Sequence, residues 1–140
     1  AKMVSRVRLV LFTQGRVGAE RGRGVPADEE FGCEGCVPTG QILRDIASLS
    51  ALITIEEHNL VLERERAATY RVHRAPTVAV VRDRDPGIRF AGAPGGYELM
   101  ALVDAILLVS TGGSGLAPGS RALLAQVQAP LDIQVFVTPT

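Results

Sequence analysis

Short apolar runs, separated by polar or amphipathic stretches, set the pattern of the first part of the chain. Residues Val7–Thr13 are apolar and rich in β-branched side chains, which is typical of a buried strand. Residues 52–57 and 77–82 have the same character. Residues 88–92 form a shorter run, and the preceding segment 83–87 has the composition of a turn. The pattern predicts strands at these positions, with the last two paired as a hairpin.

Apolar residues recur at helical spacing in two further stretches. One helix is predicted to start at about residue 36, and a longer one at Tyr97, where Gly112 is placed to end it. A polar helix is expected over 63–72. The apolar positions are Ile42, Leu43, Ile46 and Leu49 in the first helix, and Leu99, Leu102, Val103, Ile106 and Leu107 in the last. The order of elements predicts an α/β three-layer sandwich with a central mixed β-sheet flanked by helices.

The end of the chain repeats the pattern of its start. Beyond the glycine-rich segment 112–119, residues 120–128 are predicted to be helical, and residues 131–137 alternate as a strand. Apolar positions match at a constant offset of 124 residues: Ala1, Met3, Val7, Leu9, Leu11 and Phe12 with Ala125, Val127, Leu131, Ile133, Val135 and Phe136. Generic helix–turn–strand patterning is one explanation, and an internal repeat is the other. The repeat predicts one unit over 1–111, a linker over 112–119, and the helix and first strand of a truncated second unit over 120–140.

Composition and charge exclude several classes of protein. The 140 residues are 46% hydrophobic and 21% charged, which is ordinary for a globular domain and excludes a disordered or collagen-like chain. Fifteen basic and fifteen acidic residues cancel, so nucleic acid is not an expected partner. The longest apolar stretch, 99–109, is interrupted by Asp104 and is about half as long as a bilayer requires. No membrane association is expected, and because residues 1–4 lack an apolar signal core, a cytoplasmic location is expected.

Both cysteines lie in one motif, Cys33-Glu34-Gly35-Cys36. A redox dithiol, a structural disulfide and a zinc site are the three interpretations. A disulfide is unusual in the cytoplasm. Zinc needs about four ligands, and only His58 and His73 could complete the set, at spacings that match no common zinc finger. The preceding strand and the following helix favour the dithiol. The segment 15–32, rich in glycine and charge, is predicted to be a flexible loop before the motif.

The chemistry of thiol–disulfide exchange assigns different tasks to the two cysteines. Cys33, at the start of the predicted helix, would be the nucleophile, because the unpaired N–H groups and the helix dipole stabilise a thiolate there. Cys36, one turn into the helix, would resolve the mixed disulfide. The carboxylate of Glu34 opposes thiolate formation, which predicts a mild thiol with a reductase or isomerase leaning. Pro38 lacks an N–H and predicts a local irregularity in the first helical turn.

These residues carry a resemblance to the thioredoxin superfamily. The order strand, Cys33-x-x-Cys36, helix is followed by Arg74-Ala75-Pro76-Thr77, which resembles the cis-proline loop of that superfamily. The segments Gly87-Ile88-Arg89-Phe90-x-Gly92-x-Pro94-x-Gly96-Tyr97-Glu98 and Val135-Phe136-Val137-Thr138-Pro139-Thr140 are similar to the protein disulfide oxidoreductases of archaea and thermophilic bacteria, glutaredoxin-like proteins built from tandem thioredoxin folds. The chain also resembles the tandem domain at the front of alkyl-hydroperoxide-reductase flavoproteins, but the first unit of that domain characteristically lacks the cysteine pair.

The resemblance to the oxidoreductases implies a thioredoxin-like fold and thiol–disulfide exchange by the N-terminal unit of a tandem protein. It implies catalytic roles for Cys33 and Cys36, a cis peptide bond before Pro76, and substrate binding at Ala75 and Pro76, whose backbone could pair with an extended substrate. The expected partners are protein or peptide disulfides and an electron donor like thioredoxin reductase, and no cofactor is expected. The alternative is a docking half whose missing second unit carries the principal activity.

Overall fold

The computed structural model describes residues 2–14 and 33–137, so the predicted loop 15–32 lies outside the described residues. The strands are β1 (Val7–Thr13), β2 (Ile53–Asn59), β3 (Thr77–Val81) and β4 (Arg89–Ala91). The helices are α1 (Cys36–Ser48), α2 (Arg64–Thr69), α3 (Tyr97–Thr111) and α4 (Pro118–Leu124). Up to α3, the elements follow the order that the hydrophobic pattern predicts.

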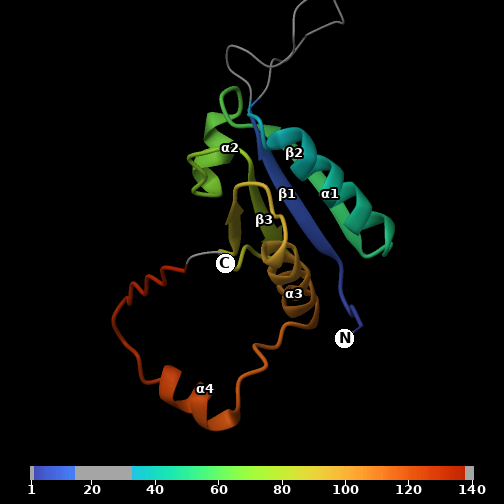
Figure 1. The fold of residues 1–140 in the computed structure, drawn as a ribbon. Helices are drawn as coiled ribbons and strands as arrows, with labels where there is room; N and C mark the ends of the chain where they lie inside the picture. The colour runs from blue at the N-terminus through green and yellow to red at the C-terminus, as the bar shows by residue number, and fades with distance from the viewer. Residues whose placement is uncertain (1, 15–32, 138–140) are drawn as a thin grey trace, which may run out of the picture.

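The strands form one mixed sheet in the order β2-β1-β3-β4 (Figure 1). β1 runs parallel to β2, with Val7 opposite Ile53 and Thr13 opposite Asn59, and antiparallel to β3. β3 and β4 pair as the predicted antiparallel hairpin. The two central strands, β1 and β3, are buried on both faces, which explains why they read as continuous apolar runs rather than alternating ones.

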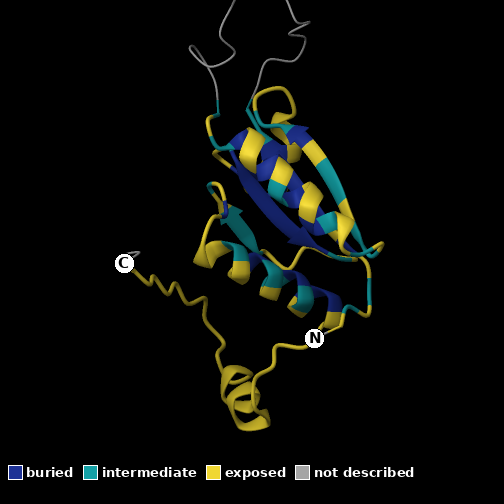
Figure 2. Cartoon of the chain, turned by 45° about the vertical axis from the view of Figure 1, so that its right-hand side comes forward, coloured by how far each residue is buried: buried dark blue, intermediate teal, exposed yellow. Residues whose placement is uncertain are grey.

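Helices cover both faces of the sheet, so the predicted three-layer sandwich is confirmed. One core joins β1 and β3 to α1 and α3 through Leu9, Leu43, Val80, Leu102 and Ile106, among others. The second core lies on the face covered by α2 and contains Val10, Phe12, Ala67, Tyr70, Val72, Ala79 and Val81. Figure 2 shows the buried sheet between helices whose outer faces are exposed. Apolar burial on both faces provides most of the driving force for this fold.

Two helix ends show how tertiary contacts modify the sequence pattern. Gly112, with φ of 73°, ends α3 as predicted, and its N–H donates to the carbonyl of Leu108. α2 is shorter than the predicted 63–72. Arg71 adopts φ of 54°, and the N–H groups of Arg71 and Val72 donate to the carbonyls of Ala68 and Ala67. This Schellman arrangement ends the helix early and turns Val72 into the core beside α2.

The C-terminal part differs from the sequence expectation. α4 begins two residues earlier and ends four residues earlier than the predicted helix 120–128, and the structure assigns no strand to residues 131–137. These residues are exposed, and a strand requires a neighbouring backbone to satisfy its N–H and carbonyl groups. The division into a first unit, a linker and the start of a second unit stays a prediction. Across the described ranges 2–14 and 33–137, no helix is long and apolar enough to cross a membrane.

Candidate redox site

The cysteine motif lies where the end of β1 meets the start of α1. Cys33 and Cys36 are joined by a disulfide, with their Cα atoms 5.3 Å apart. Cys33 is partly exposed, whereas Cys36 is 9% exposed. A turn precedes the helix, because the N–H of Cys36 donates to the carbonyl of Cys33 at 3.0 Å. Cys36 is therefore the first residue of α1 rather than one turn into it, and the two sulfurs differ in access to solvent.

The first turn of α1 shows none of the irregularity predicted from Pro38. Because α1 begins at Cys36, Pro38 occupies a position whose N–H would have no partner within the helix. The regular pattern starts at Thr39, whose N–H donates to the carbonyl of Gly35 at 3.1 Å. The Thr39 hydroxyl donates to the same carbonyl at 2.6 Å. The proline is thus accommodated by the register of the helix.

The end of β1 bonds to both cysteines. The N–H of Cys33 donates to the carbonyl of Gln14, and the N–H of Gln14 donates to Cys36 Sγ, each at 3.4 Å. On its other side, the carbonyl of Thr13 accepts the N–H of Leu60 at 2.8 Å. The motif is therefore attached to a buried central strand, which supplies a rigid base for the disulfide.

The proline loop lies directly against the motif. The Ala75–Pro76 bond is cis, as the resemblance implied. A β-carbon added to Gly35 would lie 3.2 Å from Cγ of Pro76 and 3.4 Å from Cβ of Ala93, so three segments meet at this point. The carbonyl of Pro76 accepts the N–H of Gly92. Ala75 is half-buried, and among the residues that the structure describes its backbone N–H and carbonyl have no hydrogen-bond partner.

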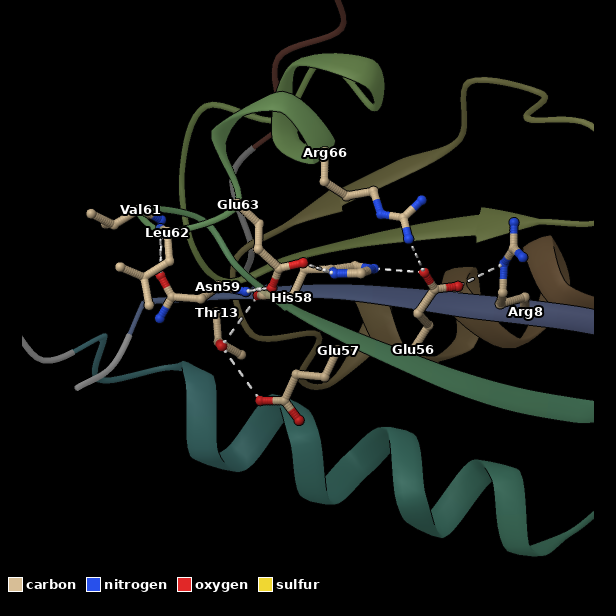
Figure 3. A network of polar contacts seen from close by, with 10 residues as sticks. All are labelled: Arg8, Thr13, Glu56, Glu57, His58, Asn59, Val61, Leu62, Glu63 and Arg66. Carbon is tan, nitrogen blue, oxygen red and sulfur yellow. Dashed lines mark hydrogen bonds and ion pairs between the residues drawn. The ribbon is translucent and has the colours of Figure 1, made fainter. Parts of the chain in front are cut away.

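A polar network at the neighbouring end of β2 was not predicted from the sequence (Figure 3). His58 is 8% exposed, and each of its ring nitrogens faces a carboxylate: Nε2 lies 2.6 Å from Glu56 and Nδ1 lies 2.5 Å from Glu63. Glu56 also pairs with Arg8 at 3.2 Å and with Arg66 at 3.3 Å. The network joins β1, β2 and α2. Its sequence signal is the spacing of Glu56 and His58, which places both on one face of the strand.

The arrangement separates the groups that the zinc interpretation combines. The cysteines are bonded to each other, and both nitrogens of His58 are engaged with carboxylates. His73, the other histidine of that interpretation, is exposed. Over residues 2–14 and 33–137, no group of three or more His, Cys, Asp or Glu side chains is arranged to hold a metal ion.

Charges around His58 shift two carboxyl groups. The hydrogen bond from His58 and the guanidinium groups of Arg8 and Arg66 lower the pKa of Glu56 below its usual range. The backbone N–H of Asn59, followed by His58, lowers the pKa of Glu63. Both groups are therefore more acidic in the folded chain than in the unfolded chain, where their ordinary pKa is 4.5. Their stabilising contribution is complete above that value and is lost as the pH falls through the folded pKa values.

We expect the free energy of unfolding to fall as the pH is lowered from about 5 to about 3. Glu56→Gln should give a shallower dependence than the wild type, because glutamine has no proton to bind. Urea unfolding curves at a series of pH values measure the slope. Glu65→Gln, an exposed carboxyl on α2 outside the network, is the matched control. Equal slopes for the wild type and Glu56→Gln would contradict the assignment.

The fold and the paired cysteines define a thioredoxin-like protein with a Cys-x-x-Cys site. No family model matches the chain. The F protein of alkyl hydroperoxide reductase from one strain of Staphylococcus epidermidis is 35% identical over 104 residues, and the same protein from a second strain is 34% identical. Each match covers 71% of this chain but 18% of the relative. The chain thus spans less than a fifth of the length of these relatives.

Solved structures show the same fold. An N-terminal domain of alkyl hydroperoxide reductase from Enterococcus faecalis has a TM-score of 0.69 at 25% identity, covering 89% of this chain and 54% of that chain. A protein disulfide oxidoreductase from Aeropyrum pernix has a TM-score of 0.68 at 24% identity, covering 89% and 49%. Thioredoxin from Fasciola hepatica has a TM-score of 0.54 at 19% identity, covering 75% and 82%.

The comparisons confirm the predicted resemblance and the thioredoxin-like fold. Structural similarity extends both to the protein disulfide oxidoreductase and to the reductase domain. The sequence relatives are components of alkyl hydroperoxide reductase, so the presence of Cys33 and Cys36 does not separate this chain from that group.

Proposed function

We propose that the chain is a thiol–disulfide oxidoreductase unit that acts on protein or peptide disulfides through Cys33 and Cys36. The observation that carries the proposal is the disulfide at the β1–α1 junction, packed against the loop that contains Pro76. The pair can be oxidised without movement of the backbone, since the Cα separation of 5.3 Å lies within the normal range for disulfides. The site therefore suits reversible two-electron exchange.

Exposure assigns the order of events. In the reduced pair, the thiolate of Cys33, which is the more accessible sulfur, attacks a substrate disulfide and releases one substrate thiolate. The buried Cys36 then attacks the Sγ of Cys33 as a thiolate. The Cys33–Cys36 disulfide forms, the bond between Cys33 and the substrate breaks, and the second substrate sulfur leaves as a thiolate that takes a proton from water. The substrate gains two electrons and the pair loses them.

The loop before β3 supplies the substrate contact. The N–H and carbonyl of Ala75, unpaired within the described part of the chain, would bond to an extended substrate segment as an added strand. Pro76 lies against the motif at Gly35 and would hold that segment beside the sulfurs. Ala75 and Pro76 therefore form the proposed binding edge for a protein or peptide disulfide.

Turnover requires a second redox partner that returns electrons to the pair. The relatives are components of a reductase, which supports an electron relay in a reducing cytoplasm with a donor like thioredoxin reductase. The alternative proposal is a docking half that binds partners while another unit carries the principal activity.

A disulfide-reduction assay tests the proposal. With dithiothreitol supplying electrons, the wild-type chain is expected to accelerate reduction of the insulin disulfides. A variant with serine in place of both Cys33 and Cys36 should leave the rate at that of dithiothreitol alone. If the wild-type chain also gives only that background rate with insulin and with small peptide disulfides, the docking alternative is favoured.

A further inference from the structure

The peptide unit between Thr13 and Gln14 is aimed at one of the two sulfurs. The N–H of Gln14 lies 3.4 Å from Cys36 Sγ and donates to it. Within residues 2–14 and 33–137, this is the only hydrogen bond made to the sulfur of either cysteine. The donor thus distinguishes Cys36, the buried sulfur, from Cys33.

The opposite side of the same peptide unit fixes its orientation. In a trans peptide the carbonyl and the N–H point in opposite directions. The carbonyl of Thr13 accepts the N–H of Leu60 at 2.8 Å, on the side of β2. The N–H of Gln14 must therefore point away from Leu60, which is the direction in which Cys36 lies. A hydrogen bond on the second strand thereby sets the direction of the donor at the sulfur.

The turn that carries Leu60 is itself held by several hydrogen bonds (Figure 3). The side-chain oxygen of Asn59 accepts the N–H groups of Val61 and Leu62 at 2.9 and 3.1 Å. The carboxylate of Glu63 accepts the N–H of Asn59 at 2.9 Å and contacts buried His58 through its other oxygen. The turn therefore presents Leu60 to Thr13 in a fixed position.

We propose that the Thr13–Gln14 peptide unit, held by the turn at residues 59–63, is a positioning group that stabilises the thiolate of Cys36 when this cysteine resolves the mixed disulfide. The inference rests on the proposed function and adds a role for the end of β1. As Cys36 loses its proton to solvent, the Gln14 N–H faces the negative sulfur without reorganisation. The thiolate then attacks Cys33 and releases the substrate thiolate, so the donor acts on the second step and not on the first.

Proline at position 14 removes the donor and keeps the chain direction, because Thr13, in β1, already has the extended conformation that a following proline requires. A hydrogen bond to a charged group is strong enough to change the thiolate population by about tenfold. The intrinsic nucleophilicity of a less acidic thiol rises and offsets part of this change, so a net slowing of about three- to fourfold is expected.

The reduced chain is mixed with excess peptide disulfide at neutral pH, quenched with an alkylating reagent, and analysed by mass spectrometry over time. In Gln14→Pro the mixed disulfide should form at the wild-type rate but persist about three- to fourfold longer. Gln14→Ala keeps the N–H and should resolve it several-fold faster than Gln14→Pro does. Equal resolution in the two variants would overturn the inference. A wild-type chain that forms no mixed disulfide would instead overturn the proposed function.

A measurement without proline covers the case in which Gln14→Pro does not fold. In Cys33→Ser, Cys36 is the only thiol, and its ionisation is followed by thiolate absorbance. The amide signal of Gln14 in an NMR pH titration should move with the same midpoint as that absorbance. An amide signal that stays fixed while Cys36 ionises would overturn the inference, whatever the catalytic activity of the chain.

Discussion

Replacing Cys33 with serine is expected to lower the rate of disulfide reduction by roughly a hundredfold or more, to the background of the assay. A serine hydroxyl is not ionised at neutral pH, so the more accessible nucleophile of the site is lost. Cys36 is 9% exposed and cannot replace it as the attacking group. The insulin reduction rate with limiting chain and excess dithiothreitol measures the effect.

Cys36→Ser should behave differently from Cys33→Ser, although it also turns over slowly. Cys33 remains able to attack a substrate, but no second thiol resolves the product. Non-reducing electrophoresis should therefore show a mixed disulfide with the substrate that dithiothreitol removes. Accumulation of this adduct in Cys33→Ser rather than in Cys36→Ser would reverse the assignment of the two roles.

Leu43→Ala is expected to destabilise the fold by about 3–5 kcal/mol. Leu43 is 0% exposed and packs, from α1, with Leu9, Val80 and other residues of the core between the sheet and the helices α1 and α3. Truncation leaves a cavity in addition to the lost burial. Because small domains are stable by only about 5–15 kcal/mol, the loss is a large fraction of the total. Urea unfolding followed by circular dichroism gives the free energy of unfolding.

The same substitution one residue beyond the helix is the matched control. Leu49 directly follows α1 and is 83% exposed. Leu49→Ala should change the free energy of unfolding by less than about 0.5 kcal/mol. A similar loss in Leu43→Ala and Leu49→Ala would show that the packing of α1 against the sheet is not as described.

The parts of the molecule that the sequence predicted are those that a local signal determines. Val7–Thr13 is a continuous apolar run, and it became the central strand β1 with those bounds. Gly112 has the conformational freedom that a helix end needs, and α3 ends there. Adjacent turn and strand signals likewise predicted the β3–β4 hairpin. For the candidate site, the motif and the resemblance predicted the cysteine pair and the cis bond before Pro76.

The remainder depends on contacts between distant segments. α2 ends at Thr69 because Val72 is turned into the core, which residue propensity does not express. The pairing of His58 with Glu63 and the aim of the Gln14 N–H require the sheet register, since both arise where β1 and β2 end side by side. Residues 131–137 alternate as a strand does, but alternation supplies no partner strand. Local patterns therefore predict elements better than they predict their ends and polar contacts.

The contact between Gly35 and Pro76 restricts how this site can be diversified. Of the two residues between the cysteines, Glu34 is exposed and can take other side chains. Any side chain at position 35 meets Pro76 and Ala93, so its introduction requires a compensating change in another loop. A library that varies both spacer residues should consequently yield functional members that differ at position 34 and keep glycine at position 35. The spacer offers one independent position for tuning the thiols.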